Sequence, residues 1–181
     1  MLNELQRQTL LALARRAIAA AFQGTPLEVD DEVLDEDLRR PAGTFVTLHA
    51  GQRQLRGCIG SVEAYEPLFQ SVTSNAVNAA FRDPRFMPLT PSELPKVSFE
   101  ISVLTPFQQV ENVDEIVPGR DGLLIRRGRN VGLLLPQVAA EYGWDRETFL
   151  SQTCVKAGLP PSSWRDPQTR IERFSAEVFG E

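Results

Sequence analysis

Two short strands joined by a tight turn constrain the fold of this chain more than any other feature of its sequence. Residues 45–49 form an apolar segment that predicts one strand, and residues 54–60 predict a second strand that returns beside it. The turn signal Ala-Gly-Gln at residues 50–52 lies between them. Strands connected by so short a turn pair antiparallel. We therefore expect an antiparallel sheet with this hairpin in it.

The remaining patterns predict helices and further strands on both sides of the hairpin. Residues 2–22 carry two adjacent apolar stripes at helical spacing, and Pro67 opens a second helix that extends to about residue 81. Strict apolar–polar alternation predicts a strand over residues 97–104. Toward the C-terminus we expect a hairpin over 122–135, helices over 136–142 and 145–157, and a closing strand over 170–179. This mixture indicates an α+β fold whose sheet is mostly antiparallel and flanked by helices.

Length and charge exclude several classes of protein. The chain has 181 residues and a net charge of −5, which suits one globular domain with room for two lobes. The mild acidity argues against nucleic-acid binding, which calls for a basic field. No apolar run approaches the roughly 18 residues of a membrane span, and the charged N-terminal segment lacks the apolar block of a signal peptide. We expect a cytoplasmic protein without nucleic-acid or membrane partners.

The supply of metal-ligating side chains is small. Cys58 and Cys154 are the only cysteines, and His49 is the only histidine. A closed zinc site of cysteine and histidine needs four ligands, and the chain has three such residues. Cys154 lies in a helical pattern and is expected in the core. The sequence predicts no metal site and no cofactor, with an incomplete open metal site of His49, Cys58 and Glu100 as the alternative. It leaves Cys58 as the candidate for thiol chemistry.

The hexapeptide Leu-Arg-Gly-Cys-Ile-Gly at residues 55–60 marks the candidate site. Gly57 and Gly60 allow close approach of the backbone to a neighbour. Arg56 lies two residues before Cys58, and a nearby arginine favours the reactive thiolate. Two interpretations stay open: Cys58 is a nucleophile, or it is a small buried residue beside glycines.

The sharpest form of the nucleophile hypothesis uses His49 as the base and Glu100 to orient it. If residues 50–53 form the turn, His49 pairs with Gln54 and Phe45 pairs with Cys58. Cys58 then lies four residues from the partner of His49, roughly 13 Å at about 3.3 Å per residue. A dyad needs about 3 Å, so this register argues against it.

Without the dyad, His49 and Glu100 have simpler predicted roles. We expect His49 to be a hydrogen-bonded residue at the end of its strand. Glu100 is the lone acid on its strand. It either faces a cleft, where desolvation raises the pKa of a carboxyl group, or forms an ion pair with an arginine such as Arg56.

Three arginines near the hexapeptide and on the predicted second helix indicate a candidate anion site. Arg56, Arg82 and Arg85 are of the type that binds carboxylate or phosphate bidentately. The alternative is that Asp83 and nearby acids pair with them. An uncharged stripe on the helix, which includes Asn75, suits the polar wall of a cleft or hydrogen bonds to loops.

These segments together resemble the AMMECR domain family, also called AmmeMemoRadiSam system protein A. The segments occur in the family's order. Because they are spread along the sequence, the resemblance covers nearly the whole chain. They are Leu-Arg-Gly-Cys-Ile-Gly at 55–60, Phe-Val-Thr-Leu-His at 45–49, Asp-Pro-Arg-Phe at 83–86, Glu-Ile-Ser-Val-Leu at 100–104, Gly-Leu-Leu-Leu-Pro-Gln at 132–137, Lys-Ala-Gly-Leu at 156–159 and the region of Trp164. Met87 departs from the pattern, since a proline is expected there.

The resemblance implies a two-lobed domain over residues 1–181. Its larger lobe comes from both ends of the chain, its smaller lobe comes from the middle, and the hexapeptide lies near the cleft. Family members are encoded beside a Memo-type dioxygenase-like protein and a radical-SAM protein, which are the expected partners. The resemblance implies no particular reaction. Two functions stay open: an enzyme or enzyme component that uses Cys58 on a small anionic substrate, or a non-catalytic protein- or peptide-binding module using the same cleft.

Overall fold

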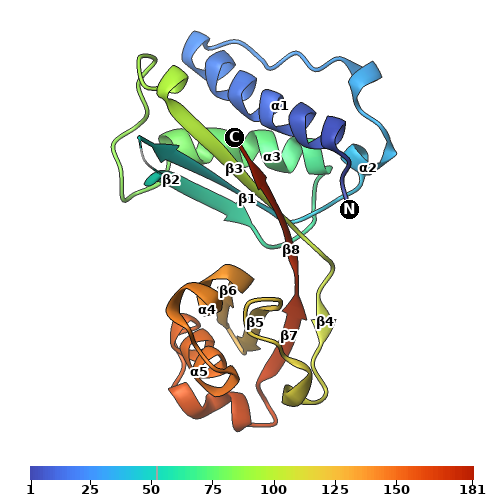
Figure 1. Cartoon of the computed structure of the whole chain (residues 1–181), viewed down its shortest axis with the longest axis vertical. Coiled ribbons are helices and arrows are strands. Elements are labelled where there is room, and N and C mark those ends of the chain that lie inside the picture. Colours follow the sequence, from blue (N-terminus) through green and yellow to red (C-terminus); the bar gives the residue numbers. More distant parts are fainter. Residues whose placement is uncertain (52) are drawn as a thin grey trace. The chain divides into compact units, whose positions relative to one another are not determined.

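The computed structural model describes residues 1–51 and 53–181 and divides them into two compact units. The larger unit consists of Met1–Leu104 and Glu177–Glu181, and the smaller unit consists of Thr105–Ala176. Each unit contains one four-stranded sheet and its own helices (Figure 1). The predicted α+β class, with antiparallel sheets and a smaller lobe from the middle of the chain, is confirmed.

The larger unit is built on a sheet with the strand order β2-β1-β3-β8. Two long helices, α1 and α3, lie against this sheet (Figure 1). The helices begin and end as the sequence dictates: the Asn3 side chain accepts from the backbone N–H of Gln6 at the start of α1, and Gly24 ends it with a φ of 66°. The elements are α1 (Glu4–Gln23), a 3₁₀ turn (Asp31–Val33), α2 (Glu36–Arg39), β1 (Thr44–Ala50), β2 (Gln54–Ser61), α3 (Leu68–Phe81), a 3₁₀ turn (Leu94–Lys96), β3 (Val97–Leu104) and β8 (Ala176–Gly180).

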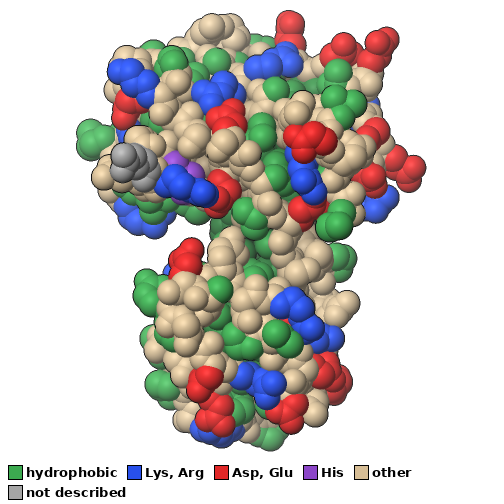
Figure 2. All heavy atoms as spheres, viewed as in Figure 1, with side chains coloured by type: hydrophobic (Ala, Val, Ile, Leu, Met, Phe, Trp, Pro, Cys, Tyr) green, Lys and Arg blue, Asp and Glu red, His purple; other side chains and the backbone are tan. Residues whose placement is uncertain are grey.

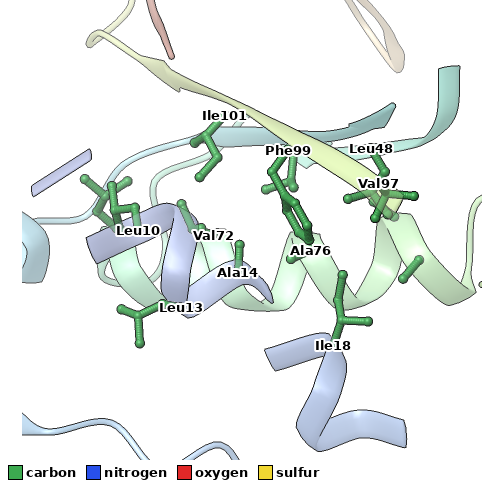
Figure 3. Close-up of a cluster of buried hydrophobic side chains, with 14 of the residues drawn as sticks. Leu10, Leu13, Ala14, Ile18, Leu48, Val72, Ala76, Val97, Phe99 and Ile101 are labelled. Atoms are coloured by element: carbon green, nitrogen blue, oxygen red, sulfur yellow. The ribbon is translucent and has the colours of Figure 1, made fainter. Parts of the chain in front are cut away.

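One face of this sheet packs on the helices and forms the core. Figure 3 shows Phe99 and Ile101 of β3 directed at Val72 and Ala76 of α3, beside residues of α1. These side chains are almost completely shielded from water, and full burial of one such large side chain contributes about 1.5–3 kcal/mol. Because side chains alternate along a strand, the residues between them lie on the opposite face.

The smaller unit has the strand order β4-β7-β5-β6 and a separate core. Cys154 lies in that core with no exposed surface, as predicted, and burial raises the pKa of its thiol. Asp145 caps the second helix by accepting from the backbone N–H of Thr148. The elements are β4 (Gln108–Gln109), a 3₁₀ turn (Val113–Glu115), β5 (Gly122–Arg127), β6 (Asn130–Leu134), α4 (Pro136–Tyr142), α5 (Arg146–Lys156), a 3₁₀ helix (Pro161–Arg165) and β7 (Arg170–Phe174).

The single closing strand predicted over residues 170–179 is wrong. The segment forms two strands, β7 and β8, which belong to different sheets and are separated at Ser175. The backbone N–H of Ser175 donates to Oγ1 of Thr105 instead of continuing a strand ladder. No helix among the described residues is long and apolar enough to cross a membrane.

Candidate functional site

The candidate site lies on the sheet face that does not carry the core of the larger unit. Val46 and Leu48 of β1 point into that core, so Thr47 and His49 point to the other side. Glu100 and Ser98 are their direct partners on β3 and share that side. We call this surface the polar sheet face. It consists of these four residues and Cys58 of β2: Thr47, His49, Cys58, Ser98 and Glu100.

The pairing of β1 with β2 differs from the predicted register. Cys58 pairs with Thr47 and Phe45 pairs with Gly60, whereas Phe45 was expected opposite Cys58. The pairing shifts between Leu48 and His49, because His49 pairs with Leu55 and Arg56 is left as an extra residue in β2. This β-bulge moves Cys58 toward His49. Gln52, in the predicted turn, lies outside the described residues.

The corrected register makes Cys58 and His49 diagonal neighbours on one face. His49 lies two residues along β1 from Thr47, the partner of Cys58. Diagonal neighbours of this kind are about 7–8 Å apart at Cα, so the predicted separation of roughly 13 Å is wrong. Thr47 also pairs with Glu100 on its other side. A cysteine, a threonine and a glutamate therefore form one row across three strands, with the histidine beside it.

The thiol of Cys58 is in contact with the hydroxyl of Thr47. Oγ1 of Thr47 lies 3.3 Å from Sγ of Cys58 and donates to it. Cys58 is half-buried, and it is a free cysteine. Thr47 is not among the site residues predicted from the sequence. Its signal there is a polar residue between apolar ones in the strand, two positions from the only histidine.

Asp83 and Arg85 hold the backbone of Cys58 at the outer edge of the sheet. Oδ2 of Asp83 accepts from the backbone N–H of Cys58 at 2.9 Å, and Arg85 donates to the carbonyl of Cys58 at 3.4 Å. Arg85 also donates to both oxygens of Asp83, which is only 4% exposed. These bonds hold the pKa of Asp83 far below its ordinary value and raise the pKa of Arg85. The pair thus bonds to the N–H and carbonyl of Cys58, backbone groups that an edge strand would otherwise leave unpaired.

Arg56 is likewise paired with an acid. Its Nε lies 2.9 Å from Oε1 of Glu93, and its Nη1 donates to the carbonyl of Met87. The hydrogen bonds from Arg56, followed by those from Thr90, lower the pKa of Glu93 to about 2. Arg56 and Arg85 thus follow the alternative interpretation of the sequence, in which nearby acids pair with the arginines. Figure 2 shows the same mixing of acidic and basic side chains over the larger unit.

Glu100 forms an ion pair with an arginine, as one of the two interpretations expected. Nη2 of Arg53 lies 3.0 Å from Oε2 of Glu100, so the partner is Arg53, whereas Arg56 was the example given from the sequence. Arg53 follows the turn with a φ of 61°, and its side chain is 79% exposed. Solvent screens such a pair, so its contribution to stability is small.

His49 does not make the hydrogen bonds that the sequence analysis expected. Both of its imidazole nitrogens are shielded from solvent, and neither has a hydrogen-bond partner among the residues that the structure describes. A buried polar group without a partner costs about 1–3 kcal/mol. His49 therefore has hydrogen-bonding capacity that the described part of the chain does not use.

The two glycines of the hexapeptide permit close contacts within the protein. A Cβ on Gly57 would lie 2.2 Å from the backbone oxygen of Ala79 in α3, and a Cβ on Gly60 would lie 2.2 Å from the ring of Phe45. Only glycine allows β2 to approach the helix and the ring this closely. Gly57 and Gly60 thus shape the strand that carries Cys58.

Asn75 and Arg82 lie elsewhere in the larger unit. Asn75 is buried, and its amide donates to the Thr44 carbonyl and hydroxyl, at 3.2 and 2.9 Å. It therefore joins α3 to strand β1, whereas the sequence led us to expect a cleft wall or hydrogen bonds to loops. Arg82 lies at the end of α3 and lines a groove against α1. The structure does not place either residue on the polar sheet face.

Comparison with known proteins assigns the family. The family model described as AMMECR1 matches residues 11–179. The chain belongs to the AMMECR1 family. Proteins of Thermococcus gammatolerans and Thermococcus kodakarensis are 45% and 46% identical to it, over 95% of this chain and 88% of each relative. The crystal structure of a Pyrococcus horikoshii protein, described as uncharacterized, has a TM-score of 0.87 and 42% identity, covering 96% of this chain and 90% of that one.

In this AMMECR1-family chain the polar sheet face offers a thiol, a hydroxyl donor, an imidazole and a carboxylate. Cys58 supplies the thiol, and the Thr47 hydroxyl donates to its sulfur. His49 supplies an imidazole, the type of side chain that most often accepts a proton in catalysis. Among the described residues, no group of three or more histidine, cysteine and acidic side chains is arranged to hold a metal ion.

Proposed function

We propose that this AMMECR1-family protein is an enzyme, or a component of one, whose reacting group is the Cys58 thiol. The contact between Oγ1 of Thr47 and Sγ of Cys58, at 3.3 Å, carries the proposal. It aims a hydroxyl donor at a half-buried sulfur, and a structural cysteine in a core needs no such donor.

The surroundings of Cys58 support a fixed position for its sulfur. Asp83 and Arg85 bond to the N–H and the carbonyl of Cys58, so its main chain is held on both sides. A reacting group is effective when its geometry is set before the substrate arrives. Gly57 adds to this, because it lets β2 rest directly on α3.

His49 is the proposed base for the thiol, and Thr47 lies between the two residues as a donor to sulfur. Supporting this role, His49 and Cys58 are diagonal neighbours on adjacent strands, a spacing that long side chains can bridge. In the step we propose, the Cys58 proton passes to His49 and sulfur bonds to a carbonyl carbon of the substrate, while the π electron pair of that C=O bond moves onto the carbonyl oxygen. Nε and Nη2 of Arg85 bond to Asp83 and the Cys58 carbonyl, but its guanidinium is 55% exposed next to Cys58 and its Nη1, unpaired within the described part of the chain, is left for a small anionic substrate.

The proposed partners are Memo-type and radical-SAM proteins, on the strength of the family resemblance alone. In this scheme the thiol site would be one component of a multi-protein system. A pull-down with the Cys58→Ser variant as bait, next to the unaltered chain, would test whether a partner depends on the thiol.

Alkylation rates test the thiol proposal directly. At pH 7 with iodoacetamide, we expect Cys58 to react at least about tenfold faster than free cysteine, because the thiolate is the reacting form. Thr47→Val, which keeps the shape and removes the donor, is expected to slow the reaction several-fold. Cys154, buried in the smaller unit, is an internal reference within the same peptide map. A Cys58 rate equal to that of free cysteine, unchanged in Thr47→Val, would reject the proposal.

A non-catalytic binding module is the second candidate, and the ion pair between Arg53 and Glu100 favours it. A carboxylate engaged by an arginine is a poor orienting group for a histidine, and it is a suitable polar contact for a peptide. The alkylation experiment separates the candidates, because a module requires no enhanced reactivity at Cys58.

A further inference from the structure

A groove between α1 and α3 lies in the larger unit and is lined by residues other than those of the polar sheet face. It encloses about 440 Å³, within the range of small-molecule sites, which is about 300–1,000 Å³. Its α1 wall consists of alanines, Ala17, Ala20 and Ala21, and Val77 of α3 and Leu27 complete the apolar surface. Small side chains on one helix leave the space that larger side chains would fill.

The opposite wall of the groove is polar. Ser74, Asn78 and Arg82 recur at a spacing of four residues along α3, so they lie on one side of the helix. They belong to the uncharged stripe and the arginine set recognised in the sequence. The structure separates that stripe into two: Ser71 and Asn75 point inward to Thr44, while this second row faces the groove.

Arg82 differs from the other arginines of the candidate anion set. Arg56 is paired with Glu93 and Arg85 with Asp83. The guanidinium of Arg82 forms no ion pair or hydrogen bond with any residue within 1–51 and 53–181. Arg82 also does not cap α1 or α3 at the carbonyls of Ala20 and Ala80, because backbone N–H groups donate to both of these carbonyls.

We propose that the groove between α1 and α3 binds a small organic carboxylate, with the carboxylate on Arg82 and its apolar body against the alanines of α1. Arg82 supplies the positive charge and the paired donors that a carboxylate requires. Ser74 and Asn78 add neutral donors on the same wall. An apolar lining with a few convergent polar groups is the usual make-up of such a site. The proposal does not involve Cys58 and stands apart from the thiol chemistry.

Hexanoate is the probe. The 181-residue protein is titrated with it, and binding is followed by ¹H–¹⁵N NMR. We expect saturable shifts of amides in α1 and α3, with a Kd of about 1 mM or tighter for a ligand of this size. Hexanamide, which has the same body without the charge, and acetate, which has the charge without the body, should each bind at least about tenfold more weakly.

Arg82→Gln is the deciding variant, because Arg82 is exposed and its guanidinium bonds to no residue within 1–51 and 53–181. It should weaken hexanoate at least about tenfold. Arg40→Gln, at an exposed arginine paired with Asp37 on α2, is the matched control and should bind like the unaltered protein. Ser74→Leu should also weaken binding, because it fills the groove. The proposal is overturned by the absence of saturable shifts, by equal binding of hexanamide, or by an Arg82→Gln variant that behaves like Arg40→Gln.

Discussion

Replacing Asp83 by asparagine tests whether this one carboxylate holds the edge of the sheet at Cys58. Both of its oxygens accept: Oδ2 takes the Cys58 N–H and a guanidinium nitrogen of Arg85, and Oδ1 takes the backbone N–H and Nε of Arg85. Asparagine has one acceptor oxygen, and its NH₂ group would face donors on the other side. The variant must therefore lose at least the two hydrogen bonds that one of the carboxylate oxygens accepts.

The loss of unfolding free energy depends on whether the donors that lose Asp83 stay buried or reach water. A hydrogen bond to a charged group contributes about 1.5–3 kcal/mol, and a buried donor left without a partner costs about 1–3 kcal/mol. Arg85 is more than half exposed and returns to water, which reduces its share. We expect Asp83→Asn to lower the free energy of unfolding by about 2–4 kcal/mol and the Tm by roughly 6–12 °C for a chain of this length.

Two measurements follow the variant, and a control accompanies them. Thermal unfolding by circular dichroism gives the stability, and hydrogen exchange of the Cys58 amide reports the local bond to Asp83. Asp31→Asn removes an exposed carboxylate that pairs with Arg39 and should change stability by less than about 0.5 kcal/mol. If Asp83→Asn matches Asp31→Asn in stability and leaves the exchange of the Cys58 amide unchanged, Asp83 does not hold the edge of the sheet at Cys58.

The pH dependence of this difference has a definite sign. The folded pKa of Asp83 lies below its unfolded value, chiefly because Arg85 donates to it. Its contribution is therefore complete above the unfolded pKa, about 3.9, and is lost as the pH falls from there toward the folded value. The stability gap between the unaltered protein and Asp83→Asn should be constant above about pH 5 and should narrow in acid.

Two other substitutions probe the same region. Gly57→Ala should destabilise by about 3 kcal/mol or more in urea unfolding, since its Cβ would meet the Ala79 carbonyl at 2.2 Å and backbone cannot rotate away; a loss below 1 kcal/mol would contradict this contact. Glu93→Gln should cost only about 1 kcal/mol at pH 7, because Glu93 is 37% exposed and water screens its pair with Arg56. That cost should vanish as the pH falls from 4.5 toward 2, since the folded pKa is the lower one, and a cost that grows in acid would refute the assignment.

Periodicity predicts most of the elements, because local patterns determine them. The alternation over residues 97–104 corresponds to β3 at the same bounds, and the apolar stripes near the N-terminus correspond to α1. The closing strand could not be divided from sequence, since alternation continues through Ser175 without a turn residue. The break depends on Thr105, whose hydroxyl accepts from the Ser175 backbone 70 residues away. A contact so distant in sequence leaves no local signal.

The same limit applies to the candidate site. Residue type identified Cys58, Glu100 and the arginines as charged or reactive groups, but not which of them pair. Arg53 and Arg56 are close in sequence, and either could reach Glu100 from a hairpin of unknown register. In the structure Glu100 forms an ion pair with Arg53, and Arg56 forms one with Glu93. Pair assignment depends on the register, and the register predicted from the turn was wrong because the pairing shifts between Leu48 and His49.

The bulge at Arg56 therefore has more influence on the site than the charge of that arginine. As the extra residue of β2, Arg56 shifts every later residue of the strand by one position relative to β1. Its side chain is held by Glu93 and by the Met87 carbonyl, both beyond α3 in the chain. These contacts stabilise the bulged arrangement in which Cys58 faces Thr47. Without the bulge, Cys58 would move to the opposite face of the sheet or away from His49 along the strand. Arg56 thus sets the position of the thiol through the backbone, and its guanidinium is already committed to Glu93.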